Sequence, residues 1–237
     1  MRAGIFEKVN KRCQGWQMRE ITVIQQDKDY LISNTGINRE SIFKEQRNYY
    51  YFLKLYNKYI PIAADTLAFC LVRNEFQFLI KTKKTEFAYS FDINCNNTQR
   101  EALIFKSKEI NKPSLQLSHF FNSYSQSINK AYNRSGGLFE SPFRRELITE
   151  ENLTDSIYRI HKYPQIMGEV DDFSIYPFSS YQILTNEFIK TLTAFEKSDL
   201  GNRVCFKNAV RVNFLNSEDV INSFGSYENF LSYHKTF

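Results

Sequence analysis

The chain has 237 residues, which is enough for one ordinary domain, or one domain with a small appendage, and too few for two full domains. Its formal charge of +5 fits an anionic partner, although many soluble proteins without such a partner share that balance. The four scattered cysteines suggest neither a zinc site nor a disulfide framework, and no apolar run approaches the roughly 20 residues of a membrane span, so we expect a soluble, cytoplasmic protein.

The first half of the chain predicts a strand, a helix and a hairpin. Residues 30–33 read as a strand that runs into a turn at Asn34-Thr35-Gly36. Between residues 44 and 59, aromatic and apolar residues recur at helical spacing, and Pro61 prevents the helix from continuing. Two apolar runs, 66–72 and 75–81, are separated only by Arg73-Asn74, which is the length of a tight hairpin loop.

The second half predicts mostly helices. A basic connector over residues 82–112 leads to a helix that follows Pro113 and stops at Gly136-Gly137, and residues 138–145 read as a short strand or extended turn. Thr149 is expected to cap a further helix that ends near Tyr163, because Pro164 follows. A last pair of helices starts at residue 216 or 217 and is broken at Gly225. This order predicts an α+β fold in which helices cover one face of an antiparallel sheet and leave the other face free for a site.

An acid and an amide interrupt the second strand of the predicted hairpin. Because side chains alternate along a strand, Phe76, Phe78 and Ile80 share the core face, while Glu75 and Gln77 project together from the opposite face, about 7 Å apart. These two polar side chains mark the candidate site.

The sequence resembles the REP-associated tyrosine transposases, within the single-tyrosine HUH transposases of the insertion-sequence-200 type, from about Tyr30 to the C-terminus. The order and spacing of several stretches carry the resemblance: 34–36 with 42–45, 52–60, 67–80, 120–139, Ile160-His161-Lys162-Tyr163-Pro164 and Phe178-Ser179-Ser180-Tyr181.

The resemblance implies a fold, a domain plan and partners. The fold would be the ferredoxin-like HUH fold, with an antiparallel sheet, helices on one face and a C-terminal helical extension. The transposase-like domain would span residues 28–184, after an N-terminal extension of residues 1–27 and before a helical extension of residues 185–237. Single-stranded or hairpin DNA would be the partner, DNA transposition the family process and a homodimer the assembly.

The resemblance also locates the family's catalytic positions, all of which differ here. In the family, two histidines on the second hairpin strand hold a divalent metal, and a helix tyrosine that opens a Tyr-Ile-His-x-Asn-Pro motif attacks the DNA phosphate. The two histidine positions carry Glu75 and Gln77, the tyrosine position carries Arg159, and Tyr163 stands at the motif's Asn. We therefore expect no working metal-dependent tyrosine nuclease and no cofactor.

Two routes to residual activity stay open at this stage. Oxygen atoms of Glu75 and Gln77 suit Mg²⁺ or Mn²⁺, although such a site would need further ligands. Tyr158 adjoins Arg159 and could replace the nucleophile, but one residue turns a helical side chain by about 100°. His161 is expected to pack or cap near the helix end rather than to catalyse.

A set of polar and basic residues is expected to contact DNA, because carboxamides can read base edges and cations neutralise phosphates. Each is also an ordinary surface residue. The set consists of Asn122, Gln126, Asn129, Lys130, Arg134, Arg144, Arg145 and Arg159. Arg159 has two possible roles: a phosphate anchor if it is free, or a structural lock if it pairs with Glu75.

These expectations make the chain a transposase-derived protein that binds DNA without cutting it. One alternative is residual metal-dependent nicking through Glu75, Gln77 and Tyr158. A second is a protein-interaction scaffold that no longer binds DNA.

Overall fold

The computed structural model describes residues 23–84, 112–185 and 214–236. Their strands are β1 (Asp29–Thr35), β2 (Ala64–Val72), β3 (Glu75–Thr82) and β4 (Arg144–Ile148). Their α-helices are α2 (Gln46–Tyr59), α4 (Pro113–Ala131), α5 (Leu153–Ile166), α7 (Ser217–Ser223) and α8 (Tyr227–Thr236), with 3-10 turns η1 (Ile37–Arg39), η2 (Glu150–Asn152) and η3 (Phe173–Ile175). No helix in these ranges is long and apolar enough to cross a membrane.

The four strands form one antiparallel sheet in the order β2-β3-β1-β4. With the chain order β1-α2-β2-β3-α4-β4, this is the ferredoxin-like arrangement, so the predicted α+β class is confirmed. The hairpin is also confirmed, because β2 and β3 pair with Val72 opposite Glu75 across the two-residue turn at Arg73-Asn74.

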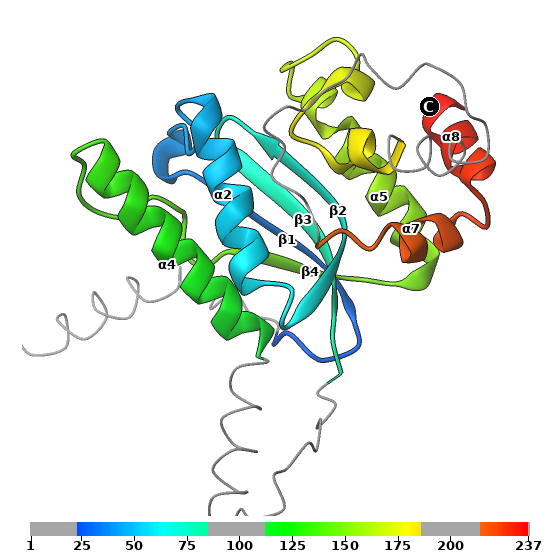
Figure 1. Cartoon of the computed structure of the whole chain (residues 1–237), viewed down its shortest axis with the longest axis horizontal. Helices are drawn as coiled ribbons and strands as arrows, with labels where there is room; N and C mark the ends of the chain where they lie inside the picture. The colour runs from blue at the N-terminus through cyan, green and yellow to red at the C-terminus, as the bar shows by residue number, and fades with distance from the viewer. Residues whose placement is uncertain (1–22, 85–111, 186–213, 237) are drawn as a thin grey trace, which may run out of the picture.

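Helices α2 and α4 cover one face of the sheet (Figure 1). The β3 residues Phe76, Phe78 and Ile80 are buried on this face, as the alternation predicted. Phe52 of α2 lies against Phe76, with ring centroids 5.1 Å apart. Aromatic packing of this kind accounts for the helical stripe seen in the sequence, because the stripe is the surface that α2 buries.

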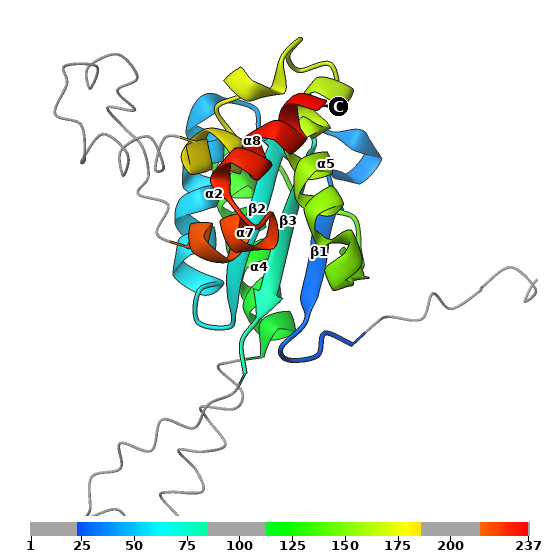
Figure 2. The same ribbon diagram turned by 90° about the vertical axis from the view of Figure 1, so that its right-hand side faces the viewer.

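The second face of the sheet is partly covered, which corrects the expectation of a free face. Helix α5 packs on β2 and β3, and α7 and α8 lie on the same side of the sheet (Figure 2). The apolar stripe of α5, with Ile157 and Ile160 buried, requires a surface to cover it, and the second face supplies that surface.

Two helix ends differ from the prediction. α5 continues through Pro164 to Ile166, because a proline in the last turn removes only one hydrogen bond, and the helix closes with the Met167 N–H donating to the Tyr163 carbonyl. α4 ends at Ala131, before the two glycines, and Asn133 takes the left-handed conformation with φ 48°.

The expected cap at Thr149 precedes η2 rather than α5, and its side chain makes no capping hydrogen bond to the backbone. Of the predicted connector, residues 85–111 lie outside the described ranges.

Gly36 allows a close approach between backbone segments after β1. A Cβ atom at this position would lie 2.1 Å from the carbonyl oxygen of Glu40. We therefore expect Gly36→Ala to lower the free energy of unfolding by about 2 to 3 kcal/mol, as overpacking does, in a urea titration. The matched control is Gly137→Ala, whose Cβ would meet only the flexible end of Ile37. Equal losses in the two variants would contradict the backbone explanation.

Candidate functional site

Glu75 and Gln77 lie on the second face of β3, both half-buried, and the Gln77 Nε2 donates a hydrogen bond of 3.4 Å to the Glu75 Oε1. This placement confirms the alternation read from the sequence. Gln77 pairs in register with the buried Cys70 of β2. Burial, together with the carboxylates of Glu169 and Glu75, raises the pKa of the Cys70 thiol, so this cysteine is protonated at neutral pH and is a poor nucleophile.

Tyr163 of α5 lies over this pair. Its phenol lies close enough to the Glu75 carboxylate and the Gln77 amide for both groups to shift its pKa. Burial, and then the charge and hydrogen bond of Glu75, raise the pKa of the Tyr163 phenol, while the hydrogen bond with Gln77 lowers it. The result is a polar cluster of Glu75, Gln77 and Tyr163 in which the phenol keeps its proton at neutral pH.

Arg159 points away from this cluster. Its side chain is 76% exposed and its Nη1 lies 3.8 Å from the Asp155 Oδ2, one helical turn earlier. The described contacts therefore contradict the alternative in which Arg159 pairs with Glu75. An exposed i, i+4 pair of this length contributes little to stability.

The cluster does not fit a divalent metal. Within the described ranges, no group of three His, Cys, Asp or Glu residues could hold an ion. Glu75 and Gln77 bring one carboxylate and one amide, and the amide nitrogen is already turned toward the carboxylate. A hard cation needs about six oxygen ligands, so the residues present do not make the centre that the family resemblance implies.

Tyr158, the possible substitute nucleophile, lies on the other side of α5. Its ring is buried against Phe173, Tyr233 and His234, and its hydroxyl accepts a hydrogen bond of 2.7 Å from the Lys162 Nζ. Tyr158 is one residue before Arg159, so its ring points to a different side of α5, where it packs under α8 and away from Glu75.

His161 belongs to a buried network that sequence reasoning missed. Its Nδ1 lies 2.9 Å from the His234 Nε2, and its Nε2 lies 2.7 Å from the Ser180 Oγ. The His234 Nδ1 lies 2.8 Å from the carbonyl of Phe230, which can only accept, so that nitrogen carries the proton. Burial lowers the pKa of both imidazoles, so both are neutral at pH 7. In that state the His161 Nδ1 donates to the His234 Nε2, and the Ser180 hydroxyl donates to the His161 Nε2.

This network joins segments that are far apart in the sequence. The Ser180 Oγ also accepts a hydrogen bond of 2.9 Å from the backbone N–H of Phe69 in β2. The network thus ties α8 and α5 to the sheet, and it connects three of the stretches that carry the family resemblance. The only signals in the sequence were the scarcity of histidines and the position of His234 on the apolar stripe of its helix.

Five of the expected DNA-contacting residues lie in three places: the outer surface of α4 and the two faces of the sheet at β4. Asn122, Gln126 and Lys130 are exposed on the outer surface of α4. Arg145 is opposite Ile32 in the sheet and so lies on the α2 and α4 side, with its guanidinium 4.3 Å from the Phe143 ring centre. Arg144 is opposite Ser33 and lies on the second face, with its Nη2 3.8 Å from the Glu140 Oε2.

Asn129 and Arg134 have structural contacts in the loop after α4. The Arg134 guanidinium donates to the Asn129 Oδ1 at 3.1 Å and pairs with the Glu40 carboxylate at 3.0 Å. The Asn129 Nδ2 donates to the carbonyl of Gly136 at 2.8 Å. These contacts hold the turn that leads into β4, and they use much of the hydrogen-bonding capacity that a base or phosphate would need.

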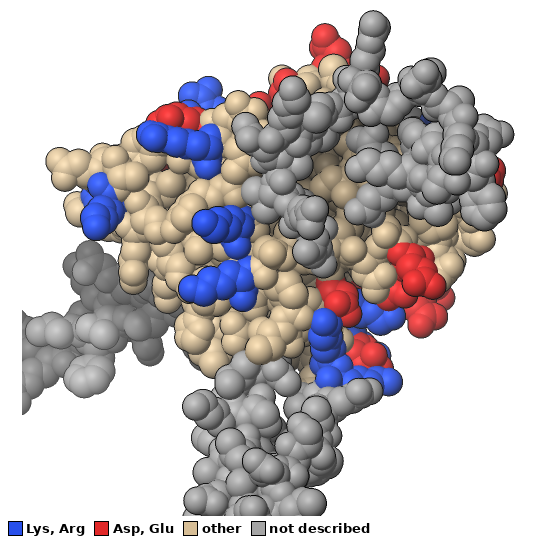
Figure 3. Space-filling model, viewed as in Figure 1, with Lys and Arg blue, Asp and Glu red and all other residues tan. Residues whose placement is uncertain are grey.

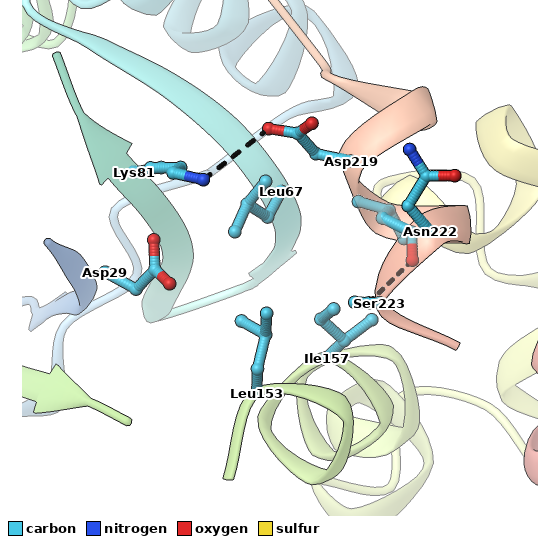
Figure 4. A pocket seen from close by; sticks show the side chains of 9 residues that line it. Asp29, Leu67, Lys81, Leu153, Ile157, Asp219, Asn222 and Ser223 are labelled. Carbon is cyan, nitrogen blue, oxygen red and sulfur yellow. Dashed lines mark hydrogen bonds and ion pairs between the residues drawn. The ribbon is translucent and has the colours of Figure 1, made fainter. Parts of the chain in front are cut away.

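A cavity of about 230 Å³ opens at the opposite end of the second face (Figure 4). Its lining residue Lys81 lies roughly 20 Å along β3 from Glu75 by the usual rise per residue. It is lined by Asp29, Leu67, Lys81, Leu153, Ile157, Asp219, Val220, Asn222 and Ser223. The Lys81 Nζ lies 3.9 Å from the Asp219 Oδ2. Burial raises the pKa of Asp29, whose Oδ1 has no hydrogen-bond partner among the described residues. The distance separates this cavity from the polar cluster.

Comparison with known proteins finds solved structures of low sequence and structural similarity. No protein-family model matches the chain, and no curated protein matches it. A solved REP-associated tyrosine transposase bound to a REP hairpin has a TM-score of 0.48 and 11% identity, covering 73% of this chain and 87% of its own. A bacterial tRNA(His) guanylyltransferase (Thg1)-like protein in complex with GTP has a TM-score of 0.32 and 8% identity, covering 83% of this chain and 79% of its own.

Proposed function

We propose that this protein binds single-stranded or hairpin DNA and does not cleave it. The observation that carries the proposal is the arrangement around β3, where the positions expected to hold a metal present Glu75 and Gln77. The position expected to hold the attacking tyrosine presents an exposed guanidinium, Arg159.

The chemistry of the cluster supports the loss of cleavage. Attack on a phosphodiester by a phenol requires an activated hydroxyl and stabilisation of the charge that develops on the phosphate. Tyr163 holds its proton under the influence of burial and of Glu75, and the carboxylate beside it would repel a phosphate. A guanidinium at residue 159 does not lose its proton in the physiological range and cannot attack.

The support for binding is chemical and independent of cleavage. The chain is cationic overall, and Lys130, Arg144, Arg145 and Arg159 are basic residues with at least partly exposed side chains. Asn122 and Gln126 add exposed carboxamides on α4. Together these provide phosphate neutralisation and base-edge hydrogen bonding, the two components of nucleic-acid recognition.

The family resemblance supports three further parts of the proposal. The DNA-binding domain would span residues 28–184, flanked by residues 1–27 and 185–237, and the assembly would be a homodimer. The location would be the cytoplasm, which suits the buried free thiol of Cys70.

The test is a mobility-shift series with a labelled DNA hairpin and its unpaired strand. For about four phosphate contacts on a single strand, raising the salt from about 50 to about 200 mM should weaken binding about 50-fold. The same mixtures with Mg²⁺ or Mn²⁺ should give no covalent protein–DNA adduct on a denaturing gel.

Two other outcomes would each contradict one part of the proposal. An adduct would refute the loss of cleavage, and the Tyr163→Phe and Tyr158→Phe variants would then identify the attacking residue. Absence of any salt-sensitive binding at low ionic strength would refute DNA binding and would favour a protein-interaction scaffold.

A further inference from the structure

Charge is divided unequally between the two helical layers. Helices α2 and α4 together contain four basic residues, Arg47, Lys54, Lys58 and Lys130, and no acidic residue. Figure 3 shows basic side chains over the α2 and α4 part of the molecule and acidic ones around α7. Arg47 is paired with Glu45 at 2.9 Å, so the positive charge of these two helices comes from the three lysines.

The opposite layer is acidic. From η2 to α8 the described residues include nine carboxylates and three basic side chains. The carboxylates are Glu150, Glu151, Asp155, Glu169, Asp171, Asp172, Glu218, Asp219 and Glu228, and the basic residues are Arg159, Lys162 and Lys235. The polar cluster of Glu75, Gln77 and Tyr163 lies beneath this layer. Among the described residues, carboxylates therefore outnumber cations on the side of the sheet that carries the polar cluster, which disfavours a polyanion there.

The lysines of α2 and α4 lie on one continuous surface. The two helices meet along a line of hydrogen bonds, 2.8 Å between the hydroxyls of Tyr51 and Ser127 and 2.9 Å between those of Tyr59 and Ser123. With 3.6 residues per turn, Lys54 and Lys58 lie one turn apart on the outer side of α2. We define the α2–α4 surface by its partly or fully exposed residues Tyr51, Lys54, Lys58, Asn122, Gln126 and Lys130.

We infer that the DNA backbone binds along the α2–α4 surface and not over the cluster at Glu75; this inference rests on the proposed function. The lysines would neutralise phosphates, and Asn122 and Gln126 would lie beside them as base-edge or sugar contacts. The surface carries carboxamides and hydroxyls between its cations, whereas a helix that binds an anionic membrane presents a broad apolar face to the lipid. Nucleic acid is therefore the better match.

The decisive comparison uses two double variants with the same change in net charge. Lys54→Gln/Lys58→Gln removes two cations from the α2–α4 surface. Lys28→Gln/Lys235→Gln removes two exposed cations that lie outside the α2–α4 surface and outside the expected DNA-contacting set. All four side chains are exposed, so both proteins should fold, which circular dichroism and thermal melting would verify.

The Lys54/Lys58 variant should bind the labelled hairpin about tenfold more weakly, and the slope of log K against log salt should fall by about 1.8 for two lost contacts to its duplex stem. The Lys28/Lys235 variant should stay within about twofold of the wild type. The reverse ranking, or equal losses, would overturn the inference while leaving DNA binding intact. Failure of the wild type to bind any DNA would instead refute the proposed function. Tighter binding to phosphatidylserine vesicles than to DNA, lost in the lysine variant, would assign the surface to membranes and overturn the inference.

Discussion

Acidification from about pH 7 to about pH 5 is expected to lower the free energy of unfolding by about 3 kcal/mol through the His161–His234 network alone. Burial and the neighbouring His234 hold the pKa of His161 well below its ordinary value, and burial lowers the pKa of His234 to about 4. Tyr158 and Phe230 are among the aromatic rings that surround this pair.

The sign follows from proton binding. Each histidine has a lower pKa in the folded protein than in the unfolded chain, so the unfolded chain binds more protons between the two values. Stability is therefore fully present above about pH 6.5 and is lost as the pH falls toward about 4. A proton added to His234 would go to its Nε2 and would face the proton on the His161 Nδ1, which would loosen α8 from α5.

Urea titrations across this range measure the effect. The double variant His161→Gln/His234→Gln should show a markedly flatter profile, and His119→Gln, at an exposed histidine of α4, should run parallel to the wild type. Should the double variant fail to fold, nitrogen NMR spectra of the wild-type histidines provide a second readout. Protonation of both buried rings in the native protein at about pH 6 would contradict the proposed network.

Phe52→Ala is expected to lower the free energy of unfolding by about 3 to 5 kcal/mol. Phe52 is completely buried, and its ring centre lies 4.6 Å from that of Phe120, 4.7 Å from Tyr124 and 5.0 Å from Phe43. Truncation removes these contacts and leaves a cavity between α2, α4 and the sheet, which a close-packed core cannot fill.

Urea denaturation at neutral pH tests this expectation, and Phe52→Leu is the matched control. Leucine keeps most of the buried volume, so its loss should be only about 1 to 2 kcal/mol. Equal stability of the alanine variant and the wild type would show that this aromatic cluster does not hold the helical layer onto the sheet.

Local patterns were sufficient for most elements of the fold. The alternation in residues 75–80 and the two-residue gap at Arg73-Asn74 predicted the hairpin, because strand pairing across so short a turn has few solutions. The helical spacing of aromatic residues predicted α2 and α4 because both helices bury one stripe. The rule that a helix ends before proline was wrong for α5, where packing on β2 and β3 outweighs one missing hydrogen bond at Pro164.

The residue types alone determined that the cluster on β3 lacks the pair of imidazoles that holds the metal in the family. The chain has only three histidines and none near the hairpin in sequence, so the sequence alone excludes a pair of imidazoles on β3. Side-chain chemistry is set by the covalent sequence, so the presence of Glu75, Gln77 and Arg159 at those positions does not depend on the fold.

Tertiary structure decided which of these groups meet. Arg159 and Tyr163 are one turn apart on the same side of α5, and only the packing of its buried stripe selects Tyr163 to face Glu75 and turns Arg159 to solvent. The contact between His161 and His234 spans 73 residues, which no local pattern can specify. The division of charge between the layers likewise arises only when α2 and α4 take one side of the sheet and α5, α7 and α8 take the other, because each helix must bury its own apolar stripe.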